Sequence, residues 1–424
     1  MELIDKICTV ILSISAALTF YKILYKVIGF FVRAKRYPKT DKRFRYGVLI
    51  AARNEAAVVG NLIDSILAQT YPRELVTVFV VADNCTDETA AICRAHGAVV
   101  YERHDPAKAR KGWAMQFLTE QIARDYGADA FDGFFVFDAD NLLAPDFIER
   151  MNEAFAAGHR VVTSYRNTKN FDTNFISAAY GIHFYHNSMA CHRPRSVLGL
   201  GTHLTGTGYL FDAKLIADGW HYTNLTEDDE LSSSLAAKGV FIGYCEAAEF
   251  YDEQPVDFGT VLRQRTRWAR GRIVNFFKNG MAVGAGIFRH KSFTCYDLFF
   301  HYFPYGLFTW LVGIIYPLVS FVYGLFTPGT EDYSHMLLNI GLLLGSKYFP
   351  SLLYGILTVI REHKHIRCGA LKTILYTFLY PWFTLISVYI YIVAVFVNVR
   401  WTPIVHNDNR TITDLHTRKD GETP

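Results

Sequence analysis

The fold is decided by the stretch Phe134-Phe-Val-Phe-Asp-Ala-Asp140, in which an apolar run leads directly into two carboxylates. Apolar side chains on both faces are typical of a strand buried between two layers of helices in a mostly parallel sheet. Because side chains alternate along a strand, Asp138 and Asp140 point to the same side where this strand ends. Ligands of such sheets bind beyond the carboxyl ends of the strands. The stretch therefore predicts a polar site at one edge of an α/β sheet.

The same pattern of apolar run and helix is found on the N-terminal side of this stretch. Residues 48–52 and 76–82 are short apolar runs, and residues 56–69 between them have the composition of a helix. Strands that alternate with helices in this way predict parallel pairing. We therefore expect one α/β domain over residues 46–255, with a mostly parallel sheet.

Polar side chains also follow the other predicted strands. Asn54 and Glu55 come after the first run, Asp83 comes after the second, and Lys111 lies in a basic loop further along the chain. The amide and carboxylate groups are suited to a ribose or base, and the lysine is suited to phosphate. The alternatives are helix capping around Asp83 and a solvated basic loop around Lys111.

Two carboxylates at a strand end also suit a metal ion. Mg²⁺ and Mn²⁺ take oxygen ligands and leave positions for water and substrate phosphates. Asp138 and Asp140 therefore predict a divalent cation site, and a diphosphate bridged by that cation is a better leaving group. A simple turn after the strand is the alternative.

Three consecutive acids, Glu227, Asp228 and Asp229, precede a predicted helix over residues 230–238. Acids are common in the first turn of a helix, where they complement the helix dipole. A carboxylate among like charges is also a suitable general base for a sugar hydroxyl. Both interpretations of this cluster stay open at this point.

A basic segment that carries Gln264, Arg267 and Trp268 is predicted to form a helix. An amphipathic basic helix that lies on anionic lipid is one interpretation. The second is a binding role, because tryptophan offers a flat surface for sugars and arginine pairs with phosphate.

The chain is also unusually apolar, since 51% of its 424 residues are hydrophobic and only 20% are charged. The apolar stretch 7–32, followed by a basic run at 33–45, predicts a membrane helix whose end faces the cytosol, with a signal peptide as the alternative. Later apolar stretches, at 304–326, 335–360 and 371–399, predict further spans. Besides the α/β domain, the expected segments are an N-terminal membrane helix with its basic flank (1–45), amphipathic interfacial helices (256–295), C-terminal membrane helices (296–400) and a tail (401–424).

The side of the membrane that holds the tail is left open by the sequence. A strict count of spans places it outside, but Pro381 could break the last span, and the basic residues of the tail favour the cytosol. The net charge of +3 is too small to indicate nucleic-acid binding, and the seven cysteines lack tight metal-ligand spacing.

The motifs occur in one order along the chain: Asp83, then Asp138-x-Asp140, then Thr226-Glu-Asp228, then Gln264-x-x-Arg267-Trp268. With apolar helices on both sides, this order resembles the processive glycosyltransferases of family 2. That group includes cellulose, chitin and hyaluronan synthases and, closest in pattern, bacterial poly-N-acetylglucosamine synthase-like proteins. The resemblance covers nearly the whole chain from Tyr46 onward. It implies a GT-A type sheet domain in the cytosol, flanked by transmembrane helices in a bacterial plasma (inner) membrane.

The resemblance also implies donor-binding roles. Asn54, Glu55 and Asp83 would hold the uridine part of a UDP-sugar, and Lys111 would lie near its diphosphate. Asp138 and Asp140 would hold the diphosphate and Mg²⁺ or Mn²⁺, with Asp140 the more direct ligand.

On the acceptor side, the resemblance makes Asp228 the base that deprotonates the acceptor hydroxyl. Glu227, Gln264, Arg267 and Trp268 would bind the acceptor end and the pyrophosphate. The segment Trp401-Thr-Pro-Ile-Val-His406 is similar to tails that lie near the active site in the poly-N-acetylglucosamine branch.

The expected reaction is an inverting displacement, in which the acceptor hydroxyl attacks the anomeric carbon from the face opposite UDP. We expect a membrane-embedded enzyme that polymerises a UDP-sugar into a β-linked polysaccharide and exports the chain through a protein-lined path. The growing polysaccharide or a lipid acceptor and membrane lipid are the expected partners. The alternatives are a non-processive transferase that adds a single sugar to a polyprenyl phosphate or lipid, and a catalytically silent scaffold or transporter.

Overall fold

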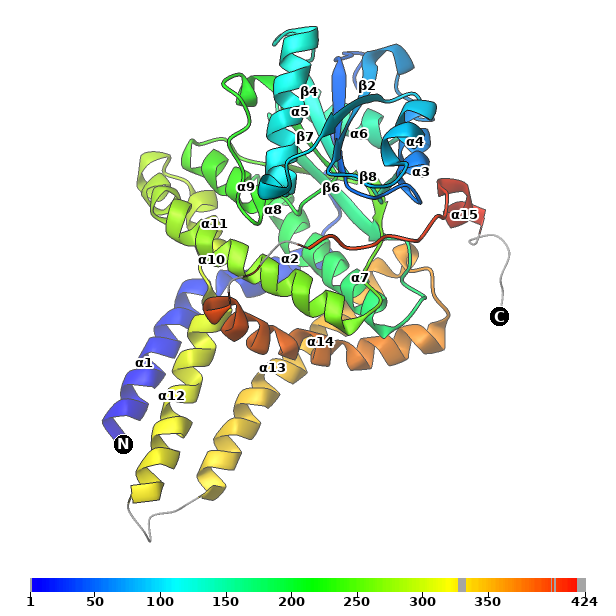
Figure 1. Ribbon diagram of the computed structural model, residues 1–424. Helices are drawn as coiled ribbons and strands as arrows, with labels where there is room; N and C mark the ends of the chain where they lie inside the picture. The colour runs from blue at the N-terminus through cyan, green and yellow to red at the C-terminus, as the bar shows by residue number, and fades with distance from the viewer. Residues whose placement is uncertain (1, 327–332, 398, 400–401, 418–424) are drawn as a thin grey trace.

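An eight-stranded sheet forms the centre of the computed structural model (Figure 1). The structure describes residues 2–326, 333–397, 399 and 402–417. The order of strands across the sheet is β3-β2-β1-β4-β7-β6-β8-β5. The strands are β1 Tyr46–Ala52, β2 Val76–Asp83, β3 Val99–Arg103, β4 Gly133–Asp138, β5 Leu142–Leu143, β6 Val161–Thr168, β7 Tyr209–Asp212 and β8 Gly243–Asp252.

Most of the strands run in one direction. β1 pairs in parallel with β2 and β4, and β2 pairs in parallel with β3. β7 is antiparallel to both β4 and β6, so β6 has the direction of β4, and β8 is parallel to β6. β5 is antiparallel to β8. The sheet is therefore mostly parallel, as expected, but it is a mixed sheet in which β5 and β7 are reversed.

Helices cover both faces of the sheet because successive strand side chains point to opposite faces. Ile50 and Phe137 pack on one face with α3, α4 and α6. Leu49 and Val136 pack on the other face with α5 and α9. The helices are α3 Val59–Leu67, α4 Thr89–Ala95, α5 Lys111–Tyr126, α6 Phe147–Ala156 and α9 Glu227–Ala237.

A further layer of helices lies below the sheet in the view of Figure 1. The long helix α10 packs against α9, α11 and α14, and α7 packs against α13 and α14. Asp257 caps the start of α10, where its carboxylate accepts a hydrogen bond from the N–H of Thr260 at 2.9 Å. The helices of this layer are α7 Phe175–Asn187, α8 Arg193–Val197, α10 Phe258–Arg289 and α11 Phe293–Tyr302.

Apolar helices project from this layer, away from the sheet (Figure 1). α1, α12 and α13 extend on the same side, and α12 packs against both α1 and α13. Among the described residues, Lys6–Phe31 and Ala370–Phe396 are long and apolar enough to cross a membrane, by length and composition alone. These stretches suggest membrane association. The apolar helices are α1 Glu2–Thr19, α2 Tyr21–Phe31, α12 Tyr305–Phe326, α13 Tyr333–Glu362 and α14 Ala370–Phe396.

Helix α14 is continuous through Pro381, although the sequence had suggested a break at this residue. The ring removes one backbone donor, but α7, α10 and α13 pack around the helix and hold it in place. In Figure 1, α14 lies across the direction of α12 and α13. It leaves Leu371, Phe378 and Trp382 exposed.

The C-terminal tail lies against the sheet domain. After α14, residues 402–411 run back along the domain to the short helix α15 (Ile412–Thr417). Leu415 of this helix packs against Leu142 and Tyr251. A strict count of spans would place the tail on the side opposite the sheet domain. In the structure the tail contacts the sheet domain, and α14 lies across α12 and α13 instead of beside them.

Candidate active site

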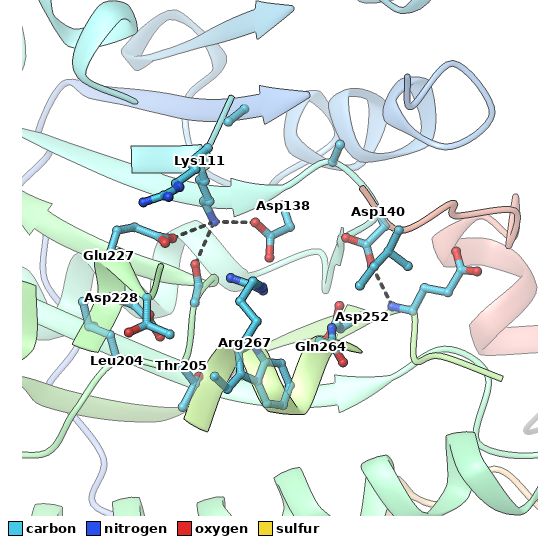
Figure 2. A pocket seen from close by; sticks show the side chains of 18 of the residues that line it. Lys111, Asp138, Asp140, Leu204, Thr205, Glu227, Asp228, Asp252, Gln264 and Arg267 are labelled. Carbon is cyan, nitrogen blue, oxygen red and sulfur yellow. Dashed lines mark hydrogen bonds and ion pairs between the residues drawn. The ribbon is translucent and has the colours of Figure 1, made fainter. Parts of the chain in front are cut away.

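A cavity of about 420 Å³ lies at the carboxyl edge of the sheet (Figure 2). Loops that follow β1, β2, β4 and β8 line it, together with the start of α9, one face of α10 and the tail. Of the site residues predicted from the sequence, the cavity is lined by Glu55, Asp83, Lys111, Asp138, Asp140, Glu227, Asp228, Gln264, Arg267 and Trp268. Residues far apart in the sequence are therefore brought to one site.

Asn54 is the predicted residue that does not line this cavity. Its backbone is in the left-handed region, with φ of 57°, and its side chain points to the neighbouring strand-end loop. There the Oδ1 atom accepts from the N–H of Thr86 at 2.8 Å, and the Nδ2 group donates to the Thr86 hydroxyl at 3.1 Å. Asn54 joins the loops after β1 and β2 in this structure.

The first part of the cavity lies where β1 and β2 end. Asp83 is buried, and the guanidinium of Arg103 donates to its carboxylate at 2.5 Å. Glu55 is also buried, and burial raises the pKa of its carboxyl although His406 opposes this shift. The Nδ1 atom of His406 lies 3.0 Å from Glu55 Oε1. Burial lowers the pKa of His406, but Asp140 and Glu55 outweigh burial and raise it to about 10, so this histidine is a cation.

Lys111 lies between two acids at the centre of the cavity (Figure 2). Its ammonium group is paired with the carboxylate of Asp138, donates to the carbonyl of Gly206 at 2.8 Å and lies 3.8 Å from Glu227 Oε1. Burial alone would lower the pKa of Lys111, but Asp138 and Glu227 raise it, so the lysine stays charged. This places a fixed cation where a diphosphate can reach it.

Asp140 lies deeper in the cavity wall and is 2% exposed. Its Oδ2 atom accepts from the N–H of Glu253 at 2.9 Å. Asp252, at the end of β8, is its neighbour, and burial together with the charge of Asp140 raises the pKa of Asp252 to about 7 although Arg166 pairs with it. Two crowded carboxylates therefore face the same region of the cavity.

These carboxylates fit a divalent cation by their chemistry. Within the described residues there is no cluster of three or more histidine, cysteine or acidic side chains arranged to hold a metal by themselves. Oxygen ligands from Asp138 and Asp140 are nevertheless the type that Mg²⁺ or Mn²⁺ prefers, with water and diphosphate completing the shell. A cation here would also relieve the repulsion between Asp140 and Asp252.

The acids at the start of α9 form the opposite wall. Burial raises the pKa of Glu227 to about 7 in spite of Lys111, and burial raises that of Asp229 to about 7 in spite of Arg272. Burial also raises the pKa of Asp228, which is the more exposed of the three and faces the cavity. Asp228 is thus a carboxylate with increased basicity, open to a ligand.

One face of α10 closes the cavity below these acids. The Oε1 atom of Gln264 accepts from the hydroxyl of Tyr180 at 2.7 Å, and Arg267 donates to the carbonyl of Leu225 at 2.7 Å. The ring of Trp268 packs edge-on against Tyr180 at a centroid distance of 6.1 Å. The helical spacing places all three α10 side chains on one face. Arg267 additionally fixes the loop that carries the acid cluster.

The sequence did not single out several cavity residues. Asp252 carries the same signal as Asp138, an acid at the end of an apolar strand, and could have been found by it. Arg166, Arg272 and His301 have no local signal, because their positions depend on how β6, α10 and α11 pack. The tail residues that line the cavity are Thr402, Pro403, Ile404 and His406, whereas Trp401 lies outside the described residues.

Comparison with known proteins identifies the family. Residues 44–271 match the family described as glycosyltransferase like family 2. The chain belongs to this family. A similar protein, the probable glycosyltransferase YdaM of Bacillus subtilis (strain 168), is 28% identical over 307 residues, which are 66% of this chain and 67% of that one. The family membership makes this chain a glycosyltransferase.

Two other similar proteins match a smaller share of the chain or have a lower sequence identity. The beta-monoglucosyldiacylglycerol synthase of Synechocystis sp. (strain ATCC 27184 / PCC 6803 / Kazusa) is 28% identical over 233 residues, and the match spans 53% of this chain and 47% of that enzyme. The mannosyltransferase PcManGT from Pyrobaculum calidifontis, solved with GDP-Man and Mn²⁺, aligns with a TM-score of 0.53 over 88% of this chain and 99% of its own, at 16% identity. This last likeness shows that the family 2 chain has a GT-A-like fold.

Proposed function

We propose that this glycosyltransferase moves a sugar, with inversion, from a UDP-sugar to an acceptor hydroxyl presented at a membrane face. The observation that carries the proposal is the arrangement of a single cavity. Lys111, Asp138 and Asp140 lie together on one wall, and Asp228 lies on another. Lys111 suits a diphosphate, and Asp138 and Asp140 suit a metal ion. They face the same space as Asp228, the carboxyl with a raised pKa.

The donor would lie along the strand ends. Glu55 and Asp83 are placed to bond the nucleoside, and the charged ammonium of Lys111 would pair with the diphosphate. Asp138 and Asp140 would hold Mg²⁺ or Mn²⁺, which stabilises negative charge on a departing diphosphate. His406 would supply a further positive charge close to Glu55.

The acceptor would approach from the side of Asp228. Its carboxylate would take the proton from the acceptor hydroxyl as the oxygen attacks the anomeric carbon. The bond from that carbon to the UDP oxygen breaks on the opposite face, so an α-linked donor gives a β-linked product. Arg267 and Trp268, on the face of α10 that lines the cavity, would hold the acceptor in line.

A single-sugar transfer to a lipid acceptor is the form of this reaction that the helix arrangement favours. A polysaccharide that crosses lipid needs a path enclosed by protein. In the part of the chain that the structure describes, α12 lies between α1 and α13, and α14 lies across them. Such a row anchors the domain at a membrane without surrounding a path. The similarity to a glucosyldiacylglycerol synthase supports the same choice.

Processive synthesis of a β-linked polysaccharide is the second candidate. Its support is the placement of Gln264, Arg267 and Trp268 along the cavity, in the order expected from processive family members. Either function would place the sheet domain in the cytosol of a bacterium, as the basic run at 33–45 favours.

Product size separates the two candidates. The full chain, reconstituted in lipid nanodiscs with Mg²⁺, is supplied with UDP-glucose, UDP-galactose, UDP-N-acetylglucosamine and GDP-mannose in parallel. We expect UDP release with one UDP-sugar and a lipid product carrying one sugar by mass spectrometry. A ladder of long polysaccharide would establish the processive function, and release of nucleotide only from GDP-mannose would contradict the UDP-sugar assignment.

A further inference from the structure

Part of the cavity lining, here called the inner region, consists of residues that the proposed mechanism does not use. In the view of Figure 2, Leu204 and Thr205 lie on the far side of Asp228 from Lys111. The lining of this inner region comes from three separate elements: His203 from the loop before β7, Arg272 from α10 and His301 from α11. The rings of His203 and His301 are stacked, with centroids 3.9 Å apart and an interplanar angle of 29°.

These side chains carry buried polar atoms without a hydrogen-bond partner among the described residues. They are Nδ1 of His203, Nε2 of His301 and Nε of Arg272. His203 is only 3% exposed, so leaving its ring nitrogen unpaired is costly. Arg272 Nε lies 3.8 Å from the carboxylate of Asp229, which is too long for a hydrogen bond.

A third histidine in the same stack, His192, has hydrogen-bond partners for its ring nitrogens. His192 packs on His203 at a centroid distance of 4.8 Å but is not part of the cavity lining. Its Nδ1 atom is 2.6 Å from the hydroxyl of Thr202, and its Nε2 atom is 3.0 Å from the amide of Asn187. The histidine outside the cavity lining has partners for both nitrogens, and the two that belong to the lining each have a buried nitrogen without one.

The charges of the inner region indicate what it binds. Burial lowers the pKa of both His203 and His301 well below the usual range, and the neighbouring rings and arginines lower it further, so both rings are neutral. The guanidinium of Arg272 faces the carboxylate of Asp229. Arg272, the cation described beside the two histidines, therefore already has an acid facing it and is not open to a lipid phosphate. A neutral imidazole offers one donor and one acceptor, which matches a hydroxyl group.

We propose that His203 and His301 form a binding site for the neutral, hydroxyl-bearing head group of a lipid acceptor, next to Asp228. This rests on the proposed transferase function and specifies its acceptor class: a glycerol or sugar head group instead of a polyprenyl phosphate. The unpaired nitrogens bond to hydroxyls of the head group, and the hydroxyl that reacts is thereby held near the carboxylate of Asp228. Both histidines bind the acceptor and take no part in proton transfer.

The test uses His203→Phe and His301→Phe, which keep an aromatic ring in the stack but remove the nitrogens. With dioctanoylglycerol as acceptor and the full chain in nanodiscs, we expect each variant to raise the acceptor KM by about tenfold. The donor KM and the slow hydrolysis of the donor without acceptor stay within about twofold. His221→Phe, on an exposed histidine outside the cavity lining, is the control and leaves all constants unchanged.

Rescue variants separate binding from a structural effect. His203→Asn places an amide near the position of Nδ1, and His301→Gln places one near that of Nε2. We expect both to recover most of the acceptor affinity. If the rings had only a structural role, the phenylalanine variants would keep more affinity than the amide variants. An unchanged acceptor KM in both phenylalanine variants, with donor hydrolysis intact, overturns the proposal but leaves the transferase function standing.

Direct binding makes the test independent of turnover. Calorimetric titration with dioctanoylglycerol should show binding to the natural protein, loss of binding in the double phenylalanine variant and binding in the Asn/Gln double variant. Tighter binding or faster use of a polyprenyl phosphate overturns the proposed acceptor class. Absence of nucleotide release with every donor, while dioctanoylglycerol binding is retained, would instead count against the proposed function.

Discussion

His406 Nδ1 lies 3.0 Å from Glu55 Oε1, although the two residues are 351 positions apart in the sequence. The contact holds the C-terminal tail across the strand ends where the nucleoside of a donor would lie. Next to it, the N–H groups of Asn407 and Asp408 donate to the carboxylate of Glu253 at 3.2 and 3.0 Å. The tail is therefore a wall of the proposed donor site.

Substitution His406→Gln tests this wall. The charge opposite Glu55 and Asp140 is lost, so we expect the KM for the UDP-sugar to rise by about tenfold and the tail to be cleaved faster in limited proteolysis. His363→Gln, on an exposed histidine, should change neither. Unaltered donor KM and cleavage in the His406 variant would show that the tail does not contribute to donor binding.

Substitution Asp228→Asn tests the base. Loss of the carboxylate should lower kcat by about a hundredfold or more, because proton removal from the acceptor then depends on water. Binding of UDP, measured by calorimetry, should be retained, since Lys111, Asp138 and Asp140 are untouched. Turnover close to that of the natural protein would remove Asp228 from this role.

Substitution Lys111→Gln tests the diphosphate contact. The variant loses the ammonium between Asp138 and Glu227, so we expect the Kd for UDP to increase by about tenfold or more. Lys108→Gln provides a matched control, because Lys108 lies in the same basic segment but is exposed and does not line the cavity. Equal UDP affinity in the two variants would contradict a specific role for Lys111.

Removal of divalent cations tests the fit of Asp138 and Asp140. Treatment with EDTA should abolish nucleotide release, and Mg²⁺ or Mn²⁺ should restore it, because the single positive charge of Lys111 only partly offsets the charge of a departing diphosphate. Asp140→Asn should require a higher cation concentration, and the exposed Asp129→Asn should not. Full activity in EDTA would show that the positive charges of Lys111 and His406 are sufficient for departure of the diphosphate.

The acids of α9 predict how stability depends on pH. Burial raises the pKa of Glu227 and Asp229 to about 7 in the folded protein, against about 4 in an unfolded chain. Between these values the folded state binds protons that the unfolded state has released, so the contribution of these two acids to stability is greatest below pH 4 and is lost as the pH rises through 7. The Tm of the ligand-free protein should fall between pH 5 and pH 8, and Glu227→Gln combined with Asp229→Asn should flatten the slope. A Tm that rises over this pH range would contradict the raised pKa values of Glu227 and Asp229.

Residues whose position follows from a strand could be predicted from the sequence. Asp83, Asp138 and Asp140 stand where apolar runs end, and parallel strands of one sheet bring such ends together. Asn54 follows the same rule by position, but its left-handed backbone turns the side chain toward Thr86. A single backbone angle is not encoded in the apolar pattern.

Other features depend on contacts between distant segments. The reversed direction of β7 is set by its pairing with β4 and β6. The position of His406 depends on α14 lying across its neighbours, which a count of apolar stretches does not reveal. His301 enters the cavity only because α11 packs against α9 and α10.

The reversal of β7 has an evolutionary consequence. Strands that run forward deliver to the site the residues that follow them, whereas β7 delivers the residues that precede it, including Gly206 and Thr207. The loop that carries His203 therefore serves both parts of the cavity, because its Gly206 carbonyl accepts a hydrogen bond from Lys111 and its Thr207 hydroxyl accepts one from the N–H of Asp138. Selection for a new acceptor would therefore act on the His203 end of the loop, whereas the end with Gly206 and Thr207 is held by its contacts with Lys111 and Asp138.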